Sequence, residues 1–307
     1  MSANPIGVFD SGVGGLSILK ALRAELPAED FVYLADTRHA PYGERDDGYV
    51  VERTRAIAQQ MRDAHAVKAL VIACNTATAA AIHLVRGEHP DLPIVGVEPA
   101  LKPAVALTRT RRIGVLATRG TLGSAKLRAL HDSLRSEAEF VLQPCDGLAD
   151  AIENGDGARI SALCARYAGA LGPYGTQPGQ IDTLVLGCTH YPFASQLLTE
   201  LVGPQVRLIE TGAPVARQTR RQLAEFYGLW TFAIRLASIV GPLSYGAIVW
   251  ATGGNQRIAI LSTAVLFVIG LLLLMPVNVA RGRRAAAEAE TALQPATGGR
   301  LQRGVGA

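Results

Sequence analysis

Short apolar runs alternate with longer amphipathic stretches over the first two-thirds of the chain. The apolar runs have the length of buried strands, and helix-length segments such as 16–26 and 49–64 lie between most of them. This alternation predicts an α/β fold with mainly parallel sheets. The predicted strands are IGVFD (6–10), FVYLAD (31–36), ALVIAC (69–74), IVGV (94–97), IGVLAT (113–118), EFVLQPC (139–145) and TLVLGC (183–188).

A faint internal repeat divides this region into two halves. IGVFDSGVGGLS at 6–17 is similar to IGVLATRGTLGS at 113–124, and ALVIACNT at 69–76 is similar to TLVLGCTH at 183–190. The two pairs have nearly the same offset along the chain. We therefore expect two α/β halves of similar build, each with a strand that ends in a cysteine.

The pattern changes abruptly near residue 226. Residues 226–250 contain a single charge, Arg235, and residues 258–277 contain none. About 20 apolar residues cross a bilayer, so both segments are candidate transmembrane helices, the second being the stronger. A charge in mid-membrane is costly, and Gly241–Pro242 would break or kink the first helix. The alternative is a pair of buried core helices. The tail, 278–307, is predicted to be disordered because it is rich in Ala, Gly and Arg.

Composition excludes several classes of protein. Among 307 residues, 49% are hydrophobic and 18% are charged, which is typical of a globular chain. A net charge of +4, scattered along the sequence, gives no reason to expect a nucleic-acid partner. The four cysteines form no CxxC pair and no zinc-type spacing, so we expect no metal. The N-terminus lacks the pattern of a secretory signal, which favours a cytoplasmic catalytic part.

Two cysteine motifs carry the clearest chemical signal. Cys74-Asn75-Thr76 and Cys188-Thr189-His190 each follow an apolar strand and precede a predicted helix. Ligands of open α/β sheets bind beyond the carboxyl ends of the strands, and a thiol at a helix N-terminus lies in a field that favours thiolate. The neighbouring polar side chains and free N–H groups suit a bound carboxylate. A lone cysteine at a strand end is usually structural, but two at matching places favour a functional pair.

A pair of opposed cysteines suits racemisation. One thiolate can remove the proton from one face of Cα while one thiol returns a proton to the other face. The pKa of free cysteine, about 8.5, needs a shift of one or two units for this work. The Cα–H of an amino acid is a very weak acid, so oriented dipoles and exclusion of water must stabilise the carbanion-like transition state.

Asp10-Ser11-Gly12 lies at the first predicted strand-to-helix turn. The stretch FDSGVGG resembles a phosphate loop only weakly, because it lacks the Lys-Ser/Thr of a P-loop and the GxGxxG register. An acidic residue there would repel phosphate and would suit an ammonium group or a cysteine that needs a proton-accepting neighbour. The alternative is that Asp10 or Ser11 caps the helix.

Further polar residues follow other predicted strands. Pro41-Tyr42-Gly43 forms a turn that could close over a small ligand or be an ordinary loop. Thr118 and Thr121 match the position of Asp10 and Ser11 in the other half. Glu153 is an isolated acid that the pattern alone places on the solvated surface.

Taken together, these residues resemble glutamate racemase from Ile6 to about Glu225. The motifs stand in order and comprise FDSGVGG, ADxxxxPYG (35–43), ACNTA (73–77), GVLAT (114–118) and LGCTHYPF (186–193). The resemblance implies two similar α/β domains that face each other across a cleft. One would comprise 1–97 with 210–225, and the other 98–209. Neither pyridoxal phosphate nor a metal would be required.

The resemblance also assigns roles. Cys74 would serve the D-isomer and Cys188 the L-isomer of glutamate as the acid/base pair. Asp10 and His190 would assist these two thiols respectively, with Glu153 near the second. The residues that would hold the substrate are Ser11, Pro41, Tyr42, Gly43, Asn75, Thr76, Thr118 and Thr189. The product, D-glutamate, would be used for peptidoglycan and hence cell shape. Assembly as a homodimer is left open.

The C-terminal third departs from this resemblance. Family members usually continue with polar helices that complete the first domain, whereas here 208–225 leads directly into the apolar region. That region resembles the last two membrane helices of a major-facilitator-type transporter, so the chain resembles a fusion. Arginines lie on both sides of 226–277 and the loop between its helices has only Arg257, so the positive-inside tendency places both ends in the cytoplasm. We expect a cytoplasmic racemase tethered to the inner membrane by a hydrophobic hairpin.

Two alternatives remain. The chain could be an aspartate-type racemase of the same superfamily, because a few pocket positions set substrate length. It could also be an inactive racemase-like module attached to the membrane, since the missing end of the first domain would leave an apolar face exposed.

Overall fold

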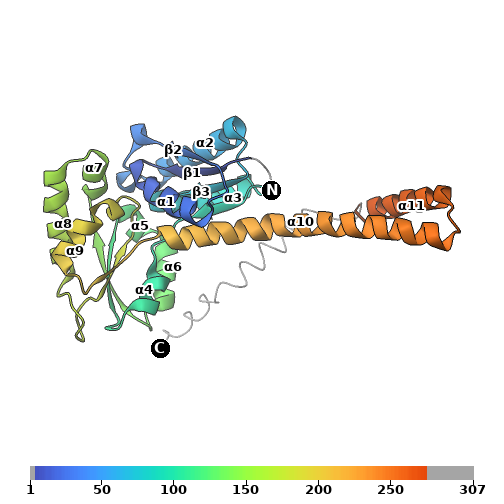
Figure 1. Ribbon diagram of the computed structural model, residues 1–307. Helices are drawn as coiled ribbons and strands as arrows, with labels where there is room; N and C mark the ends of the chain where they lie inside the picture. Colours follow the sequence, from blue (N-terminus) through green and yellow to red (C-terminus); the bar gives the residue numbers. More distant parts are fainter. Residues whose placement is uncertain (1–3, 275–307) are drawn as a thin grey trace, which may run out of the picture. The chain divides into compact units, whose positions relative to one another are not determined.

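A computed structural model describes residues 4–274; for 229–231, 233, 266, 269–271 and 273–274 it describes the backbone alone. The chain divides into two compact units, the first ending at Thr231 and the second beginning at Phe232. The first unit contains two parallel sheets with helices around each (Figure 1). The α/β class predicted from the sequence is thereby confirmed. The finer domain boundaries stay a prediction.

The first sheet has the strand order β2-β1-β3-β4, and every pairing is parallel. Its strands are β1 (Ile6–Asp10), β2 (Phe31–Ala35), β3 (Ala69–Ile72) and β4 (Ile94–Gly96). All four were predicted to within two residues. Its helices are α1 (Leu16–Glu25), α2 (Asp47–His65) and α3 (Asn75–Glu88), with short 3-10 helices η1 (Val13–Gly15), η2 (Thr37–His39) and η3 (Tyr42–Glu44).

The second sheet repeats this topology with the order β6-β5-β7-β8, again parallel. β5 takes the place of β1 and β7 that of β3, as the internal repeat predicted. The strands are β5 (Arg112–Ala117), β6 (Glu139–Pro144), β7 (Thr183–Leu186) and β8 (Arg207–Ile209). The helices are α4 (Leu101–Leu107), α5 (Arg119–Gly123), α6 (Ala125–Leu134), α7 (Leu148–Glu153), α8 (Gly157–Leu171), η4 (Tyr191–Ala194) and α9 (Ser195–Val202).

The central strands β1, β3, β5 and β7 are buried on both faces, because alternate side chains of a strand point to opposite sides and helices cover each side. In β1, Phe9 packs with the apolar residues of α2 and α3, whereas Ile6 and Val8 pack with those of α1. In the second sheet, Leu184 and Leu186 of β7 face α7, α8 and α9, while Val185 faces α4 and α6. Continuous apolar runs, rather than alternating ones, are the sequence signature of strands buried in this way.

Helix α10 (Gly212–Ala251) completes the outer face of the first sheet. Val215, Ala216 and Leu223 join the core formed by Ile18 and Leu22 of α1. The Tyr227 hydroxyl also donates to the backbone carbonyl of Lys68, at 2.8 Å. The start of this helix therefore covers apolar surface of the first half. From the sequence, that surface was expected to be exposed, because the family's usual C-terminal helices are missing.

The second unit contains the rest of α10 and α11 (Gln256–Leu274). α10 continues through Pro242, so the helix is not broken there; the alternative, a kink at Gly241–Pro242, stays a prediction. Large apolar side chains are exposed, among them Leu243 at 68%, Trp250 at 87% and Phe267 at 76%. Within the part of the chain that the structure describes, one stretch is long and apolar enough to cross a membrane, Ile234–Ala251. The second predicted segment, 258–277, extends beyond the last described residue, and the tail 278–307 lies outside the described residues.

Candidate functional site

The polar residues singled out in the sequence converge at the carboxyl ends of the strands. Most of them follow β1, β2 and β3 in the first sheet and β5 and β7 in the second, and line one small cavity, whereas Asp10, Thr121 and Glu153 lie outside its lining. Parallel strands place their carboxyl ends at the same edge, which is where open sheets bind ligands. The lining residues are Ser11, Pro41, Tyr42, Gly43, Cys74, Asn75, Thr76, Thr118, Ala149, Cys188, Thr189 and His190.

Cys74 occupies the N-cap position of α3. Its sulfur accepts a hydrogen bond from the Ala77 N–H at 3.4 Å and lies 3.8 Å from the Ser11 hydroxyl. The side chain is buried, and burial together with the nearby Asp10 carboxylate raises the pKa of the Cys74 thiol well above its ordinary value. In the ligand-free site this cysteine therefore carries its proton.

Cys188 has a different electrostatic environment. Its sulfur lies 3.8 Å from Nδ1 of His190, and the other ring nitrogen of His190 lies 2.7 Å from the Glu153 carboxylate. Burial alone would lower the pKa of His190, but the hydrogen bonds with Cys188 and Glu153 outweigh it and raise the pKa to about 10. The imidazole is consequently a cation at neutral pH, beside the second thiol.

Glu153 was placed on the solvated surface by its sequence pattern, and that prediction is wrong. Its side chain is 14% exposed and accepts the backbone N–H of Val13, 140 residues away, with an N···O distance of 2.9 Å. The contact arises because Glu153 ends α7 where that helix meets η1. The hydrogen bond from His190 also holds the pKa of Glu153 below its ordinary value.

Asp10 ends β1 and is completely buried. Its carboxylate accepts the Ser11 N–H at 2.8 Å and the Thr189 hydroxyl at 3.1 Å, so it bridges the two halves of the site. Burial raises the pKa of Asp10, and its interactions with His190, Ser11 and Thr189 only partly offset this. Neither Asp10 nor Ser11 caps a helix, because η1 begins at Val13 without a side-chain cap. The capping alternative is therefore wrong.

The glycines of FDSGVGG permit close contact between the two halves. A Cβ on Gly14 would clash with the His190 ring and lie 2.7 Å from the Thr189 hydroxyl. A Cβ on Gly12 would clash with the Glu153 carboxylate. These positions exclude any side chain because Cys188-Thr189-His190 and Glu153 fill the space.

The cavity itself is small, at about 20 Å³. That volume holds about one water molecule. Asn75 lines it with a side-chain amide that is 3% exposed and whose nitrogen and oxygen find no hydrogen-bond partner among the described residues. A buried amide without partners is costly unless a ligand supplies them. The site therefore holds unused hydrogen-bonding capacity directed at a small polar molecule.

Comparison with known proteins explains this arrangement. The family model described as "Asp/Glu/Hydantoin racemase" matches residues 6–219. The chain belongs to this racemase family.

Named relatives within the family are glutamate racemases. The enzyme of Pseudomonas paraeruginosa is 52% identical over 222 residues, which are 72% of this chain and 82% of the relative. That of Pseudomonas aeruginosa PAO1 is 50% identical over 221 residues, 71% and 81% of the two chains. The Escherichia coli glutamate racemase, solved with L-glutamate and an activator, superposes with a TM-score of 0.63 at 32% identity, covering 72% of this chain and 82% of that one.

A different family model matches the C-terminal region. It is described as "Vacuole effluxer Atg22 like" and covers residues 220–287. The match begins where the racemase match ends. This agrees with the change of pattern near residue 226, where the racemase family's usual continuation is absent.

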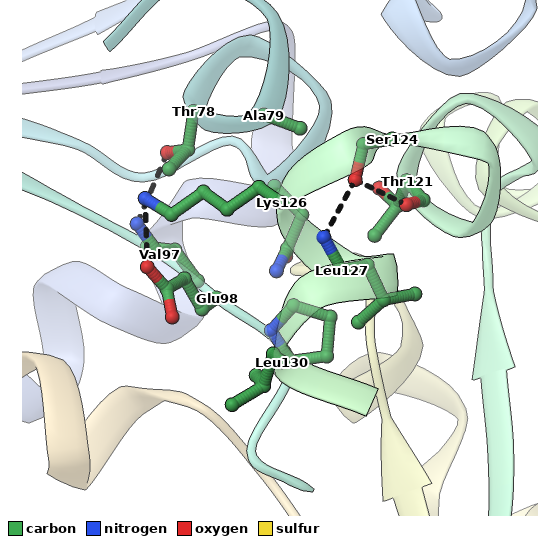
Figure 2. A pocket seen from close by; sticks show the side chains of 11 residues that line it. Thr78, Ala79, Val97, Glu98, Thr121, Ser124, Lys126, Leu127 and Leu130 are labelled. Atoms are coloured by element: carbon green, nitrogen blue, oxygen red, sulfur yellow. Dashed lines mark hydrogen bonds and ion pairs between the residues drawn. The ribbon is translucent and has the colours of Figure 1, made fainter. Parts of the chain in front are cut away.

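A second, still smaller cavity lies behind Asn75, between α3 and α6 (Figure 2). Here the Lys126 ammonium pairs with Glu98 at 2.7 Å, and the Ser124 hydroxyl accepts the Leu127 N–H at the start of α6. Thr121, which was noted together with Thr118 in the sequence, lines this second cavity. It acts on the first cavity indirectly, by accepting a hydrogen bond from Thr118 at 2.9 Å.

Three residues at the racemase site were not singled out in the sequence. Ala149 lines the cavity, whereas Asp36 and Arg53 lie outside its lining. Ala149 is an ordinary apolar residue of α7 and gave no signal. Asp36 lies within the ADxxxxPYG motif and could have been found there. Across residues 4–274 no group of three or more His, Cys, Asp or Glu side chains is placed to hold a metal; independence from cofactors stays a prediction.

Proposed function

We propose that this chain interconverts L- and D-glutamate by proton transfer between two cysteines, without a cofactor. The observation that carries the proposal is that Cys74 and Cys188, which follow equivalent strands of two different sheets, line the same buried cavity. Relatives about half identical over most of their length are glutamate racemases. The D-glutamate produced would be used to build peptidoglycan in the cell wall.

The two thiols have different surroundings, and this difference supports a choice of which one takes the proton from L-glutamate. Cys74 is protonated, whereas the Cys188 sulfur lies 3.8 Å from Nδ1 of the cationic His190 imidazole. The Cys188 thiolate would take the Cα proton of L-glutamate, and the Cys74 thiol would give its proton to the opposite face. The product is D-glutamate, with Cys188 now a thiol and Cys74 a thiolate. The reverse reaction, or exchange with solvent, restores the first state.

The surrounding groups suit the substrate's charges. The Asn75 amide and the first N–H groups of α3 offer donors to carboxylates. The Thr76, Thr118 and Thr189 hydroxyls lie at the same cavity, but in the ligand-free site they bond to one another, to Thr121 or to Asp10. Asp10, buried beside Cys74 between the two halves, would assist that thiol in proton transfer. Because the ligand-free cavity has room for about one water, glutamate must widen it on entry and expel that water.

The test is racemisation by the full chain in detergent. L-Glutamate should lose its circular dichroism, and in D₂O the Cα position should acquire deuterium. L-Aspartate at the same concentration distinguishes the aspartate-type alternative, since it should react far more slowly. No change in either signal with glutamate would refute the proposal and favour the inactive module.

We further propose that the C-terminal hairpin attaches this catalytic part to a membrane. Support comes from the apolar stretch Ile234–Ala251 of α10, from its exposed large side chains and from the similarity of 220–287 to an effluxer family. Arg235 lies at the end of this stretch, where it can reach the headgroup region. The flanking arginines favour a cytoplasmic racemase.

Carbonate extraction of membranes from expressing cells tests this attachment. An inserted hairpin keeps the chain in the pellet. Release into the supernatant excludes insertion without affecting the proposed activity.

A further inference from the structure

The loop Pro41-Tyr42-Gly43, which lines the cavity, is fixed from behind by a buried hydrogen-bond network. Tyr42 is 1% exposed, packs on Phe9 with ring centroids 6.2 Å apart, and donates its hydroxyl to Asp36 at 2.6 Å. The tyrosine hydroxyl is therefore a principal anchor of the loop on its own half of the molecule.

Asp36 in turn depends on Arg53. Its carboxylate is buried and accepts two hydrogen bonds from the guanidinium of Arg53, Nε at 3.0 Å and Nη2 at 2.8 Å. Burial would raise the pKa of Asp36, but the hydrogen bonds from Arg53 and Tyr42 outweigh it and hold the pKa below its ordinary value. A bidentate guanidinium–carboxylate pair is both strong and directional. Arg53 thus fixes the charge and the orientation of the group that holds Tyr42.

The loop leaves little room for adjustment on its other side. A Cβ on Gly43 would lie 2.8 Å from Thr118, so the loop backbone packs directly against a cavity residue of the second half. The neighbouring Glu44 accepts the Gly147 N–H at 3.0 Å across the same gap. A small shift of Tyr42 would therefore move the adjacent Gly43 against Thr118 and change the lining of the cavity.

We infer that Arg53, through Asp36 and Tyr42, is a positioning residue that sets the loop 41–43 against the bound amino acid. The inference rests on the proposed function, since it assumes that this loop touches the substrate. Arg53 lies on α2 and does not line the cavity, so its effect is on substrate binding and orientation rather than on proton transfer.

The experiment compares Arg53→Met, Arg53→Lys and Arg55→Met in the full chain. Arg55 is on the same helix and pairs with Glu88 at 2.6 Å, outside the network, and is the matched control. We expect Arg53→Met to lower kcat/KM roughly 10- to 100-fold, chiefly through KM, because misplacement of about 1 Å has effects of this size. Arg53→Lys keeps the positive charge but cannot donate two parallel hydrogen bonds to Asp36, so its kcat/KM should fall less than that of Arg53→Met. Arg55→Met should match the parent chain.

The pH dependence separates positioning from a merely structural effect. Without Arg53 the pKa of Asp36 rises, because only the Tyr42 hydroxyl and His39 are left to lower it, so the ratio of KM in Arg53→Met to KM in the parent chain should increase as the pH falls. Amide hydrogen exchange over 42–45 should quicken at least several-fold in Arg53→Met and stay unchanged in Arg55→Met.

The outcomes are distinguishable. An unchanged KM and unchanged exchange in Arg53→Met overturn the inference and leave the proposed function intact. A lower kcat at constant KM, shared equally by lysine and methionine, also overturns it, because that pattern indicates a loss of folded protein. If the parent chain does not racemise glutamate, the proposed function fails, and the exchange measurement alone still decides whether Arg53 orders the loop.

Discussion

Nε2 of His190 lies 2.7 Å from the Glu153 carboxylate, joining the turn after β7 to the last residue of α7. The other ring nitrogen, Nδ1, lies 3.8 Å from the Cys188 sulfur. Glu153 therefore fixes which way the imidazole points and keeps it charged, and it does so without lining the cavity.

Removal of that carboxylate should change the pH dependence of the reaction. In Glu153→Gln the pKa of His190 should fall from about 10 toward its ordinary value of 6.5. The alkaline decline of kcat/KM, measured between pH 6 and 11, should then begin at lower pH. The stability that His190 contributes is complete below about pH 6.5 and lost as the pH rises through about 10, so the variant's urea midpoint should vary less over this range.

An exposed glutamate is the control for this change. Glu139→Gln, at the surface of β6, should keep the parent pH profile. An alkaline limb that stays in place in Glu153→Gln would show that His190 does not depend on Glu153 for its charge.

Loss of either cavity thiol should abolish racemisation, since each face of Cα needs its own proton carrier. We expect Cys74→Ala and Cys188→Ala to be inactive in the circular dichroism assay. Cys164, buried among the apolar residues of α8, serves as the control, and Cys164→Ala should remain active. Racemisation that survives in Cys74→Ala or Cys188→Ala contradicts the two-thiol mechanism.

Gly14 should tolerate no side chain. In Gly14→Ala the new Cβ must displace His190 or Thr189, and kcat/KM should fall on the order of 100-fold. Gly87, inside α3, is the control, because a Cβ added there would have nothing among the described residues within 4 Å. Gly87→Ala should keep full activity and stabilise the chain by about 0.5–1 kcal/mol. Equal activities of the two variants would show that His190 can move without consequence.

The Asn75 side chain should lower the stability of the ligand-free protein and strengthen the binding of glutamate. Because its buried amide has no partner within the described structure, Asn75→Leu should raise the free energy of unfolding by about 1–3 kcal/mol. The same change should weaken glutamate binding, measured by calorimetry, because the amide's donors are lost. A variant that binds glutamate as tightly as the parent would remove Asn75 from the substrate site.

Charge placed on the apolar part of α10 should detach the chain from membranes. Ile239 and Leu243 are 59% and 68% exposed in the candidate span. Each aspartate at such positions costs about 2.5–3.5 kcal/mol on insertion, so Ile239→Asp with Leu243→Asp should appear in the carbonate supernatant. The exchange Ile239→Leu with Leu243→Ile should stay in the pellet. Retention of the aspartate variant would argue against an inserted α10.

The sequence predicts the central strands of this fold well because they are buried on both faces and form continuous apolar runs. β8 was missed because Arg207–Ile209 is too short and begins with a charge. The same holds for the site: Cys74 and Cys188 stand out through local motifs. Glu153 and Arg53 do not, because their partners Val13 and Asp36 are distant along the chain or on another element. Such contacts depend on tertiary packing, which periodicity does not encode.

The lack of space around the two sulfurs should slow their oxidation or alkylation. Cys74 and Cys188 are 5% and 7% exposed, so a peroxide or an alkylating reagent can reach them only while the halves are parted. Damage should therefore accumulate during turnover rather than at rest, and an enzyme short of substrate is the one whose nucleophiles last longest.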